Sequence, residues 1–571
     1  MKKKIICLFL GVTMVISMVL TSCEKLGGNS TEETTSTSNR AMTLTIATSK
    51  GENTSDAAIE RVTKAINVIT EAKYNTHVEF YFYPKDELKN AVLSKVDDIQ
   101  NQLKGGAGLA SDNVDEEAED EVIVDEESGR KTTVYPSVDP TQFDIILING
   151  IDDYTEYMNM NVFVEGEEEK GLLAEITPTT LVSQYVDPVV LTMAKDYSVD
   201  SVDFASGTAY AIPNNRDWGE YNYIVVNKEL ADKYYYDPDK FCSYDDGSNN
   251  AVISLGAVEK LFTEVRDDYG TEYTLLANKP GIDTITYTID EGIPLGTSQF
   301  MLPGSSTTTR LEAPPKNLYG SDAYKTYYRV MSQLNSWGCM PTNEVADLNS
   351  KFVVAYVKGC SESVANIDRN KYYVGVANTP VKSNDTVFGS MYAVTKYTKS
   401  VERATEIIEM FNCNADFRNT LYYGVENIDY VKDADSGNII RTTKDWNMDI
   451  YDSGNLFLLE RSEELGDYYY SMSKNNWESG KALNRDSVTG LNLGFCVEKT
   501  DAIQSNIESL RKKVAAWDAQ LLVSGDAAAV SSVKDQFDAS PEYEYLCGQT
   551  EGVNTLLKQY RSWYGKIIPA K

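Results

Sequence analysis

The stretch from Tyr210 to Leu230, YAIPNNRDWGEYNYIVVNKEL, is the part of the sequence around which the fold is organised. A short apolar run stops at Pro213, a polar segment with Trp218 follows, and a second strand-like run occupies Tyr223 to Val226. A strand, a proline-bounded crossing and another strand are typical of a chain that passes between two lobes of an α/β protein. Ligand sites are common beside such crossings. The alternative is an ordinary strand–turn–strand in which Trp218 is partly buried.

The sequence before this stretch alternates between strand and helix patterns. Strands are expected at Thr43 to Thr48, His77 to Tyr83 and Phe143 to Ile148, and helices at Ile59 to Ile69 and Asp86 to Leu103. The order strand–helix–strand–helix–strand predicts right-handed crossovers and a parallel sheet.

Beyond the crossing, helices and strands alternate again and a helical region follows. The expected helices are Val258 to Asp268, Ala323 to Trp337, Val401 to Phe411, Asp416 to Tyr422, a long helix capped by Thr500 or Asp501, and Glu551 to Tyr564; the expected strands are Phe352 to Val357, Tyr372 to Val376 and Gly389 to Thr395, with a hairpin from Gly424 to Arg441.

Composition sets limits on the function. A chain of 571 residues can form two or more domains. Its formal net charge of −33 argues against nucleic acid or an anionic lipid surface as a ligand of the folded part of the protein. The acidic run Asp115 to Glu127 lies within residues 105–140, which we expect to be an exposed insertion or a disordered loop.

The N-terminus predicts export and lipid attachment. Lys2 to Lys4 form a basic region, and Ile5 to Leu20 form an apolar region too short for a stable spanning helix. Leu20-Thr21-Ser22-Cys23 resembles the lipobox of bacterial lipoproteins, so we expect a signal peptide over 1–22, a lipid-modified Cys23 and a flexible tether over 23–40. A plain secretory signal with a chance cysteine is the alternative.

The sequence predicts no catalytic residue, metal or cofactor. His77 is the one histidine, it lies mid-strand, and a catalytic or zinc site would need partners that the sequence does not supply. No P-loop or G-x-G-x-x-G is present, and the calcium-like segment from Asp433 has Lys444 where an EF-hand needs glutamate. The six cysteines after Cys23 form no C-x-x-C pair, so we expect scattered buried thiols.

Aromatic content favours a carbohydrate ligand. The chain has 38 Tyr and 6 Trp. A sugar ring offers one apolar face and a rim of hydroxyls, so a sugar site needs flat aromatic side chains together with Asp, Glu, Asn and Arg. Trp218 has such neighbours, from Asn214 to Tyr221.

Six segments carry a resemblance to a known family. They are the lipobox, Asn75 to Val78 leading into Lys85 to Leu88, Phe143 to Ile146, Tyr210 to Leu230, Ser400 to Ala404 and Asn419 to Glu426. In these segments and their order the chain resembles the extracellular solute-binding proteins of family 1, the carbohydrate-binding lipoprotein subunits of ABC importers. Within that family it is most similar to the large Gram-positive members with a long C-terminal helical extension. The resemblance spans the chain from Met1 to about Lys571, with the acidic insertion as the main departure.

The resemblance implies a two-lobed α/β fold of the periplasmic-binding-protein type (type II) that closes over its ligand by a hinge. On this basis the N-lobe should comprise 41–217 and 389–441, and the C-lobe 218–388 and 442–571 with the C-terminal helices.

The function implied is that of a receptor, not an enzyme. It would be a lipid-anchored monomer on the extracellular face of the cytoplasmic membrane of a Gram-positive bacterium. Its partners would be a carbohydrate ligand and the permease subunits of an ABC importer, with contact to the membrane through the lipid alone. A surface sugar sensor or adhesin is the second interpretation, and a glycoside hydrolase acting through paired carboxylates is the third.

The expected ligand-binding residues rest on positions at strand ends and on the crossing. They are Glu52, Asp152, Asp153, Asn214, Asn215, Arg216, Trp218, Glu220, Tyr221, Tyr223, Trp337, Tyr392 and Trp446.

Overall fold

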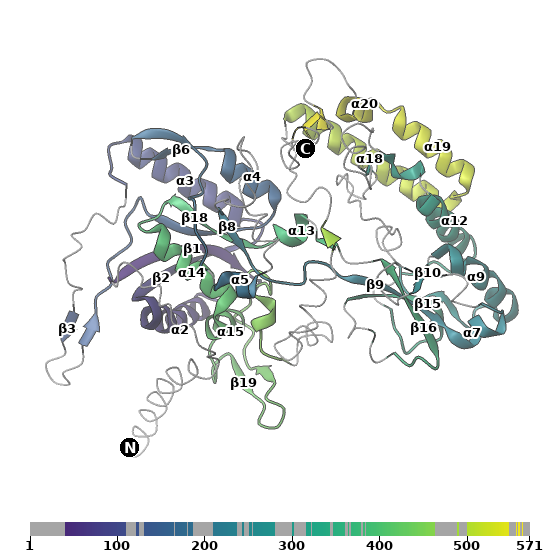
Figure 1. Cartoon of the computed structure of the whole chain (residues 1–571), viewed down its shortest axis with the longest axis horizontal. Coiled ribbons are helices and arrows are strands. Elements are labelled where there is room, and N and C mark those ends of the chain that lie inside the picture. The colour runs from purple at the N-terminus through teal and green to yellow at the C-terminus, as the bar shows by residue number, and fades with distance from the viewer. Residues whose placement is uncertain are drawn as a thin grey trace. The chain divides into compact units, whose positions relative to one another are not determined.

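The structure is a computed structural model that describes most of the chain from residue 40 onward (Figure 1). The predicted signal peptide, Cys23 and the tether lie outside the described residues, as do most of the acidic run Asp115 to Glu127 and most of the predicted helix over 551–564. The described residues are 40–109, 122–124, 131–164, 166–179, 181–186, 209–236, 242–244, 251–253, 255–279, 300–301, 316–320, 322–342, 346–359, 364, 367–378, 381–382, 384–462, 488–489, 500–547, 555–556, 558–559 and 562.

The first sheet has five strands in the order β2-β1-β5-β18-β8. β1 (Met42–Lys50) lies parallel to both β2 (Thr76–Pro84) and β5 (Phe143–Ile148), as the alternating pattern predicts. β18 (Met391–Tyr397) is antiparallel to β5 and to β8 (Ala211–Pro213). The sheet is therefore mixed, with its parallel strands contributed by the N-terminal part of the chain.

Helices cover both faces of this sheet (Figure 1). Since β1 lies between β2 and β5, right-handed crossovers place the two connecting helices on opposite faces. These helices are α2 (Asp56–Tyr74) and α3 (Leu88–Lys104). α14 (Val401–Cys413) and α15 (Ala415–Tyr423) pack on the side of α2. The sheet is thereby enclosed, which explains why its central strands are apolar.

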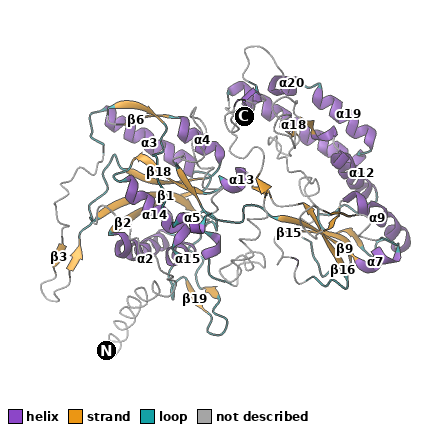
Figure 2. Ribbon diagram, in the orientation of Figure 1, coloured by secondary structure: helices purple, strands orange, loops and turns teal. Residues whose placement is uncertain are grey.

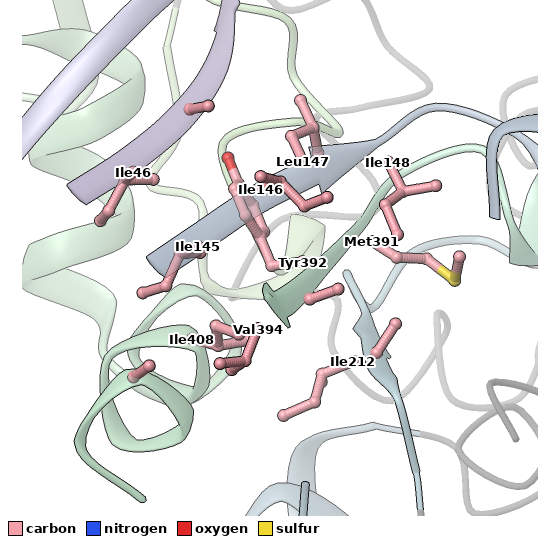
Figure 3. Close-up of a cluster of buried hydrophobic side chains, with 14 of the residues drawn as sticks. Ile46, Ile145, Ile146, Leu147, Ile148, Ile212, Met391, Tyr392, Val394 and Ile408 are labelled. Carbon is pink, nitrogen blue, oxygen red and sulfur yellow. The ribbon is translucent and has the colours of Figure 1, made fainter. Parts of the chain in front are cut away.

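The core of this body is formed by strand residues packed between the helices (Figure 3). Every residue of β5 is buried, as expected for a strand covered on both faces. Ile145, Ile146 and Tyr392 are among the side chains drawn in the close-up.

The one carboxylate of β5, Asp144, is held by a set of donors that makes its burial possible. Thr45 donates through its backbone N–H (2.8 Å) and its hydroxyl (2.9 Å), and the Gln142 amide (2.7 Å), the Thr398 hydroxyl (2.7 Å) and the Lys399 backbone N–H (3.1 Å) complete the set. Buried polar groups are tolerated when their hydrogen bonds are satisfied.

The second sheet has six strands in the order β10-β11-β16-β9-β15-β12 and is also mixed. Its centre is β9 (Tyr221–Asn227), which is antiparallel to both β15 (Phe352–Gly359) and β16 (Tyr372–Asn378). The predicted crossing is confirmed, because β8 belongs to the first sheet and β9 to the second. The remaining members and packed helices are β10 (Cys242–Tyr244), β11 (Ala251–Ile253), β12 (Thr274–Leu276), α7 (Lys228–Lys233), α9 (Leu255–Tyr269) and α12 (Asp322–Ser336).

The C-terminal helices share the core of the second sheet. They are α18 (Asp501–Ser524), which Thr500 caps as predicted, α19 (Ala527–Asp538) and α20 (Pro541–Cys547), and Figure 2 shows this region as helical. Asp518 on α18 accepts hydrogen bonds from the hydroxyls of Tyr319 (2.6 Å) and Tyr328 (2.5 Å). The extension is therefore joined to α12 by buried contacts.

Short elements complete the chain. Within the acidic insertion, β3 (Val122–Val124) and β4 (Lys131–Thr133) form a hairpin that exposes Val122 and Ile123. The predicted hairpin between Gly424 and Arg441 is confirmed as β19 (Tyr430–Lys432) and β20 (Ile439–Arg441). The others are α4 (Ile151–Asn159), β6 (Asn161–Val164), β7 (Glu167–Lys170), α5 (Val182–Tyr185), β13 (Phe300–Met301), β14 (Lys316–Asn317), η1 (Leu318–Gly320), β17 (Val381–Lys382), α13 (Asn384–Val387), η3 (Leu456–Leu458) and β21 (Val488–Thr489).

Two boundaries differ from the predicted division into lobes. Trp218 and Trp446, which the prediction gave to the C-lobe, are buried in the core of the first sheet. Trp446 packs edge-on against Phe82 of β2, with ring centroids 5.5 Å apart, and its indole N–H donates to the Leu421 carbonyl (3.1 Å). The segment after β20 therefore returns to the first sheet, because its apolar residues complete that core.

Candidate functional site

One edge of the first sheet gathers polar residues from segments far apart in the sequence. The carboxyl ends of β1, β2, β5 and β8 meet there, and the first residues of antiparallel β18 reach the same edge. Ligands of open α/β sheets bind beyond the carboxyl ends of the strands. We call this the strand-end site; its residues are Ser49, Lys85, Asn149, Asn214, Arg216, Ser390 and the loop Asp449–Asn455.

The centre of the strand-end site is the carboxylate of Asp452, whose side chain has no exposed surface. It accepts a hydrogen bond from the Ser49 hydroxyl (2.7 Å) and lies 3.1 Å from the ammonium of Lys85. The Asn149 amide, with its nitrogen toward Asp452, donates to the carboxylate (3.2 Å). Burial, followed by repulsion from Asp449, raises the pKa of Asp452, while Lys85 and Ser49 act in the opposite direction.

Lys85 is positioned by two carboxylates directly after β2. Its ammonium lies 3.3 Å from Asp449 and 3.1 Å from Asp452. Burial disfavours the charged ammonium, but the two carboxylates outweigh that effect and raise the pKa of Lys85. The side chains of Lys85 and Asp449 remain 48% and 36% exposed, so both can contact a ligand.

The predicted residues Asn214 and Asn215 lie at this edge, but both are buried. The Asn214 amide donates to the Ser390 hydroxyl (3.1 Å) and to the Tyr451 carbonyl (3.0 Å). The backbone N–H of Asn215 donates to the side chain of Asn412 (2.8 Å). These amides fix the start of the crossing and the loop beside it.

Arg216 lies on the crossing with 17% of its side chain exposed. Its guanidinium carbon lies 3.4 Å from the centroid of the Tyr451 ring, a stacked cation–π contact. The buried Asp217 carboxylate lies 3.7 Å from the guanidinium. A flat, charged and hydrogen-bonding surface thus stands next to the loop of Asp452.

A buried arginine on α15 holds the loop Asp449–Asn455 in place. Arg418 donates to the carbonyls of Ile450 (2.7 Å) and Asn455 (3.1 Å). Complete burial lowers the pKa of Arg418 to about 10. Gly454 allows the loop to lie close to the backbone of Phe411, because it has no side chain. Its backbone φ of 121° is also a conformation that glycine adopts without strain.

Three aromatic residues predicted to contact a ligand are core residues. Trp218 and Tyr392 have 0% exposed surface and Trp446 has 2%. The Tyr392 hydroxyl is engaged with the Thr48 hydroxyl (2.8 Å) and the Asp452 carbonyl (2.7 Å). In this structure none of the three presents a ring face to a ligand, so the prediction is corrected for them.

The predicted acidic residues lie at the same edge of the first sheet. Glu52 and Asp152 are exposed after β1 and β5. Asp153, in the first turn of α4, forms an ion pair with Lys89 (2.8 Å). Their contact with a ligand stays a prediction.

Four predicted residues belong to the second sheet and its helices. Glu220 pairs with Lys358 (2.8 Å), and the rings of Tyr221 and Tyr223 lie 5.5 Å apart on β9. Tyr223 is 7% exposed, whereas Trp337 after α12 is half-buried, with the Arg266 guanidinium 4.5 Å from its ring centroid. Their contact with a ligand also stays a prediction.

The predicted ligand-binding residues include neither Lys85 nor Asn149, nor the residues of the loop Asp449–Asn455. The rule that favours strand ends does indicate the segment that begins at Asn149 after β5, and it could have identified Lys85, which directly follows β2. The loop Asp449–Asn455 follows no strand and carries no motif, and only its three-dimensional packing places it at the site.

The described residues give no indication of a metal centre. In that part of the chain there is no group of three or more His, Cys, Asp or Glu that could hold a metal ion. His77 lies on β2 with its Nδ1 2.8 Å from the Glu71 carboxylate and is part-exposed, which agrees with the structural role expected for it. Cys339, Cys413 and Cys547 are free thiols, each partly buried.

The sequence similarity of this chain to known proteins is low. No family model matches the chain. A carbohydrate ABC transporter substrate-binding protein of Streptococcus pneumoniae is 21% identical over 378 residues, which are 62% of this chain and 69% of that protein.

Solved structures extend the likeness to nearly the whole chain. The N-glycan transport solute-binding protein NgtS of Streptococcus pneumoniae superposes with a TM-score of 0.54 at 15% identity, over 92% of this chain and 98% of that one. An extracellular solute-binding protein of Bifidobacterium longum subsp. infantis gives 0.48 at 11% identity, over 92% and 98%. The likeness to NgtS shows that the fold is that of a solute-binding protein, which confirms the predicted fold class.

Proposed function

We propose that this protein is the substrate-binding component of a carbohydrate ABC importer. It captures a sugar or oligosaccharide and delivers it to the permease subunits, and it acts as a monomer without catalysing a reaction. The observation that carries the proposal is the strand-end site, where part-exposed charged groups are fixed at the carboxyl edge of the sheet in a solute-binding fold. The relative from Streptococcus pneumoniae, a carbohydrate ABC transporter substrate-binding protein, supports the choice of ligand.

The topology supports a binding cycle in which two lobes close on the ligand. β8 and β9 connect the two sheets through the crossing at Arg216 to Glu220, and β18 returns the chain to the first sheet. We propose that these connections are the hinge about which two lobes close on the ligand. The N-lobe would include the segment 442–461 in addition to 41–217 and 389–441, because Trp446 completes its core.

A thermal-shift screen against a panel of oligosaccharides tests the function. A ligand that binds only the folded protein stabilises it by RT ln(1 + [L]/Kd), or about 2.7 kcal/mol at a hundredfold excess over Kd. We expect at least one glycan to raise the melting temperature in a dose-dependent way and to be recovered intact. Cleavage of the glycan would indicate a hydrolase, and no shift with any glycan would contradict the proposal.

We further propose that the protein is anchored by a lipid on Cys23 at the extracellular face of the cytoplasmic membrane. Within the described part of the chain, no helix is both long and apolar enough to cross a membrane. The basic and apolar segments before Leu20-Thr21-Ser22-Cys23 support the lipid as the anchor.

Replacing Cys23 with alanine should move the protein from the membrane fraction to the medium. The acyl chains attached to this cysteine would be lost, and each buried CH₂ contributes about 0.8 kcal/mol to membrane binding. Fractionation and immunoblotting measure the outcome, with Cys413→Ala as the control, since that thiol lies within the folded body. Retention of the Cys23→Ala protein on membranes would rule out the lipid anchor.

A further inference from the structure

We infer that the strand-end site binds an uncharged sugar through adjacent hydroxyls at the pair Lys85 and Asp449, and that it discriminates against acidic sugars. The inference rests on the proposed function and identifies the class of ligand. Neither residue was among those predicted from the sequence.

The pair offers complementary hydrogen-bonding groups side by side. The Lys85 ammonium and the Asp449 carboxylate are 3.3 Å apart, and both side chains are part-exposed. An ammonium only donates and a carboxylate only accepts, whereas each sugar hydroxyl can do both. One hydroxyl can therefore accept from Lys85 while its neighbour donates to Asp449, and charged partners make such hydrogen bonds strong.

The pair is held in place before a ligand arrives. Lys85 is tied to Asp452, which Ser49 and Asn149 hold from two strands of the sheet. Asp449 accepts hydrogen bonds from the backbone N–H groups of Tyr451 (2.8 Å) and Asp452 (3.2 Å). A prearranged group loses less conformational entropy on binding, so more of the interaction energy contributes to affinity.

The charge balance at this edge disfavours an acidic ligand. Lys85 faces two carboxylates, so the cluster of Lys85, Asp449 and Asp452 has more negative than positive groups. Lys89 is likewise engaged by two carboxylates, those of Asp153 (2.8 Å) and Glu156 (2.7 Å). The guanidinium of Arg216, the other cation of the site, lies 3.7 Å from the carboxylate of Asp217. A uronic acid or sialic acid carboxylate at Asp449 would meet a like charge, and juxtaposed like charges oppose binding.

The alternative is that Lys85 only fastens the loop to β2. The two roles predict different results when Lys85 is replaced by methionine, which keeps an unbranched side chain and removes the charge. A fastening role predicts a lower melting temperature with unchanged affinity. A ligand contact predicts lower affinity with a melting temperature close to that of the control.

The experiment uses the mature full-length chain and calorimetric titration with two sets of probes. The uncharged set is maltotriose, mannopentaose, chitotriose and kestose, and the acidic set is trigalacturonate, trimannuronate and sialyllactose. The variants are Lys85→Met, Lys85→Arg and Asp449→Asn. Lys432→Met is the control, because Lys432 is similarly exposed and pairs with Glu460 at 2.8 Å in the same body, away from the strand ends.

We expect an uncharged glycan to bind, and Lys85→Met and Asp449→Asn each to weaken it at least tenfold, with Lys85→Arg losing less and the control unchanged. Asp449→Asn should also reduce the difference in affinity between the acidic and the uncharged probes. Unchanged affinity in both variants, or binding of the acidic set alone, would overturn the inference and leave the proposed function standing. If the wild-type protein bound no probe of either set, the proposed function and the inference would fail together.

Discussion

Replacing Trp218 with alanine should lower the free energy of unfolding by about 3–5 kcal/mol, the cost typical of deleting a buried tryptophan. The side chain has no exposed surface and belongs to the core of the first sheet. Alanine would leave a large cavity that the enclosed sheet cannot close, because helices cover both of its faces. Urea denaturation followed by circular dichroism measures the change.

The same variant separates a core role from a ligand contact. If Trp218 only fills the core, the folded fraction of Trp218→Ala should bind a glycan with nearly the affinity of the wild type. Trp218→Phe is the matched control, since phenylalanine retains much of the ring volume and should cost about 1–2 kcal/mol. A fall in affinity of tenfold or more without a fall in stability would contradict the burial of this side chain and restore the stacking interpretation.

The elements of the first sheet could be predicted because their sequences carry strong local signals. The apolar run of β5 and the helical spacing of α2 give the parallel order of β2, β1 and β5. Ser55, Asn227 and Ser400 act as helix caps through side-chain oxygens, which is a preference that sequence alone reveals. Local propensity and fold agree at these positions.

The direction in which an aromatic side chain points could not be predicted in the same way. Trp218 and Arg216 are two residues apart on an irregular crossing, yet Trp218 is fully buried and the side chain of Arg216 is 17% exposed. Irregular backbone has no period from which to assign faces, unlike a strand or a helix. The composition of the crossing therefore placed Trp218 among the candidate ligand contacts, but it could not indicate that the ring is buried.

The centre of the strand-end site depends on contacts between segments very distant in sequence. Ser49 and Asp452 are 403 positions apart, and their hydrogen bond exists only because the segment after β20 returns to the first sheet. No motif or spacing in the sequence indicates that this segment returns to the first sheet. The rule that ligands bind at strand ends identifies the edge of the sheet, but only the three-dimensional packing shows that Asp452 lies there.

Replacing Gly454 with alanine should be the most damaging change in the loop Asp449–Asn455, lowering the free energy of unfolding by about 3–5 kcal/mol through backbone strain and overpacking together. The φ of Gly454 is 121°, where residues with a side chain are strained. A Cβ would overlap the Phe411 carbonyl and lie 2.8 Å from Cδ of Arg418, which is itself completely buried and cannot move aside.

Gly437→Ala is the control that isolates the backbone contribution. Gly437 has a φ of 72° in the turn between β19 and β20, and nothing lies within 4 Å of its added Cβ, so alanine there should cost only about 1 kcal/mol. The difference between the two variants, measured by urea denaturation, is the cost of the overlap with Phe411 and Arg418.

Because the same loop carries Asp449 and Asp452, Gly454→Ala should also weaken glycan binding by tenfold or more, whereas Gly437→Ala should leave it unchanged. Equal destabilisation by both substitutions would mean that the loop can move away from α15, and the fixed arrangement of Lys85 and Asp449 would then lose its structural basis.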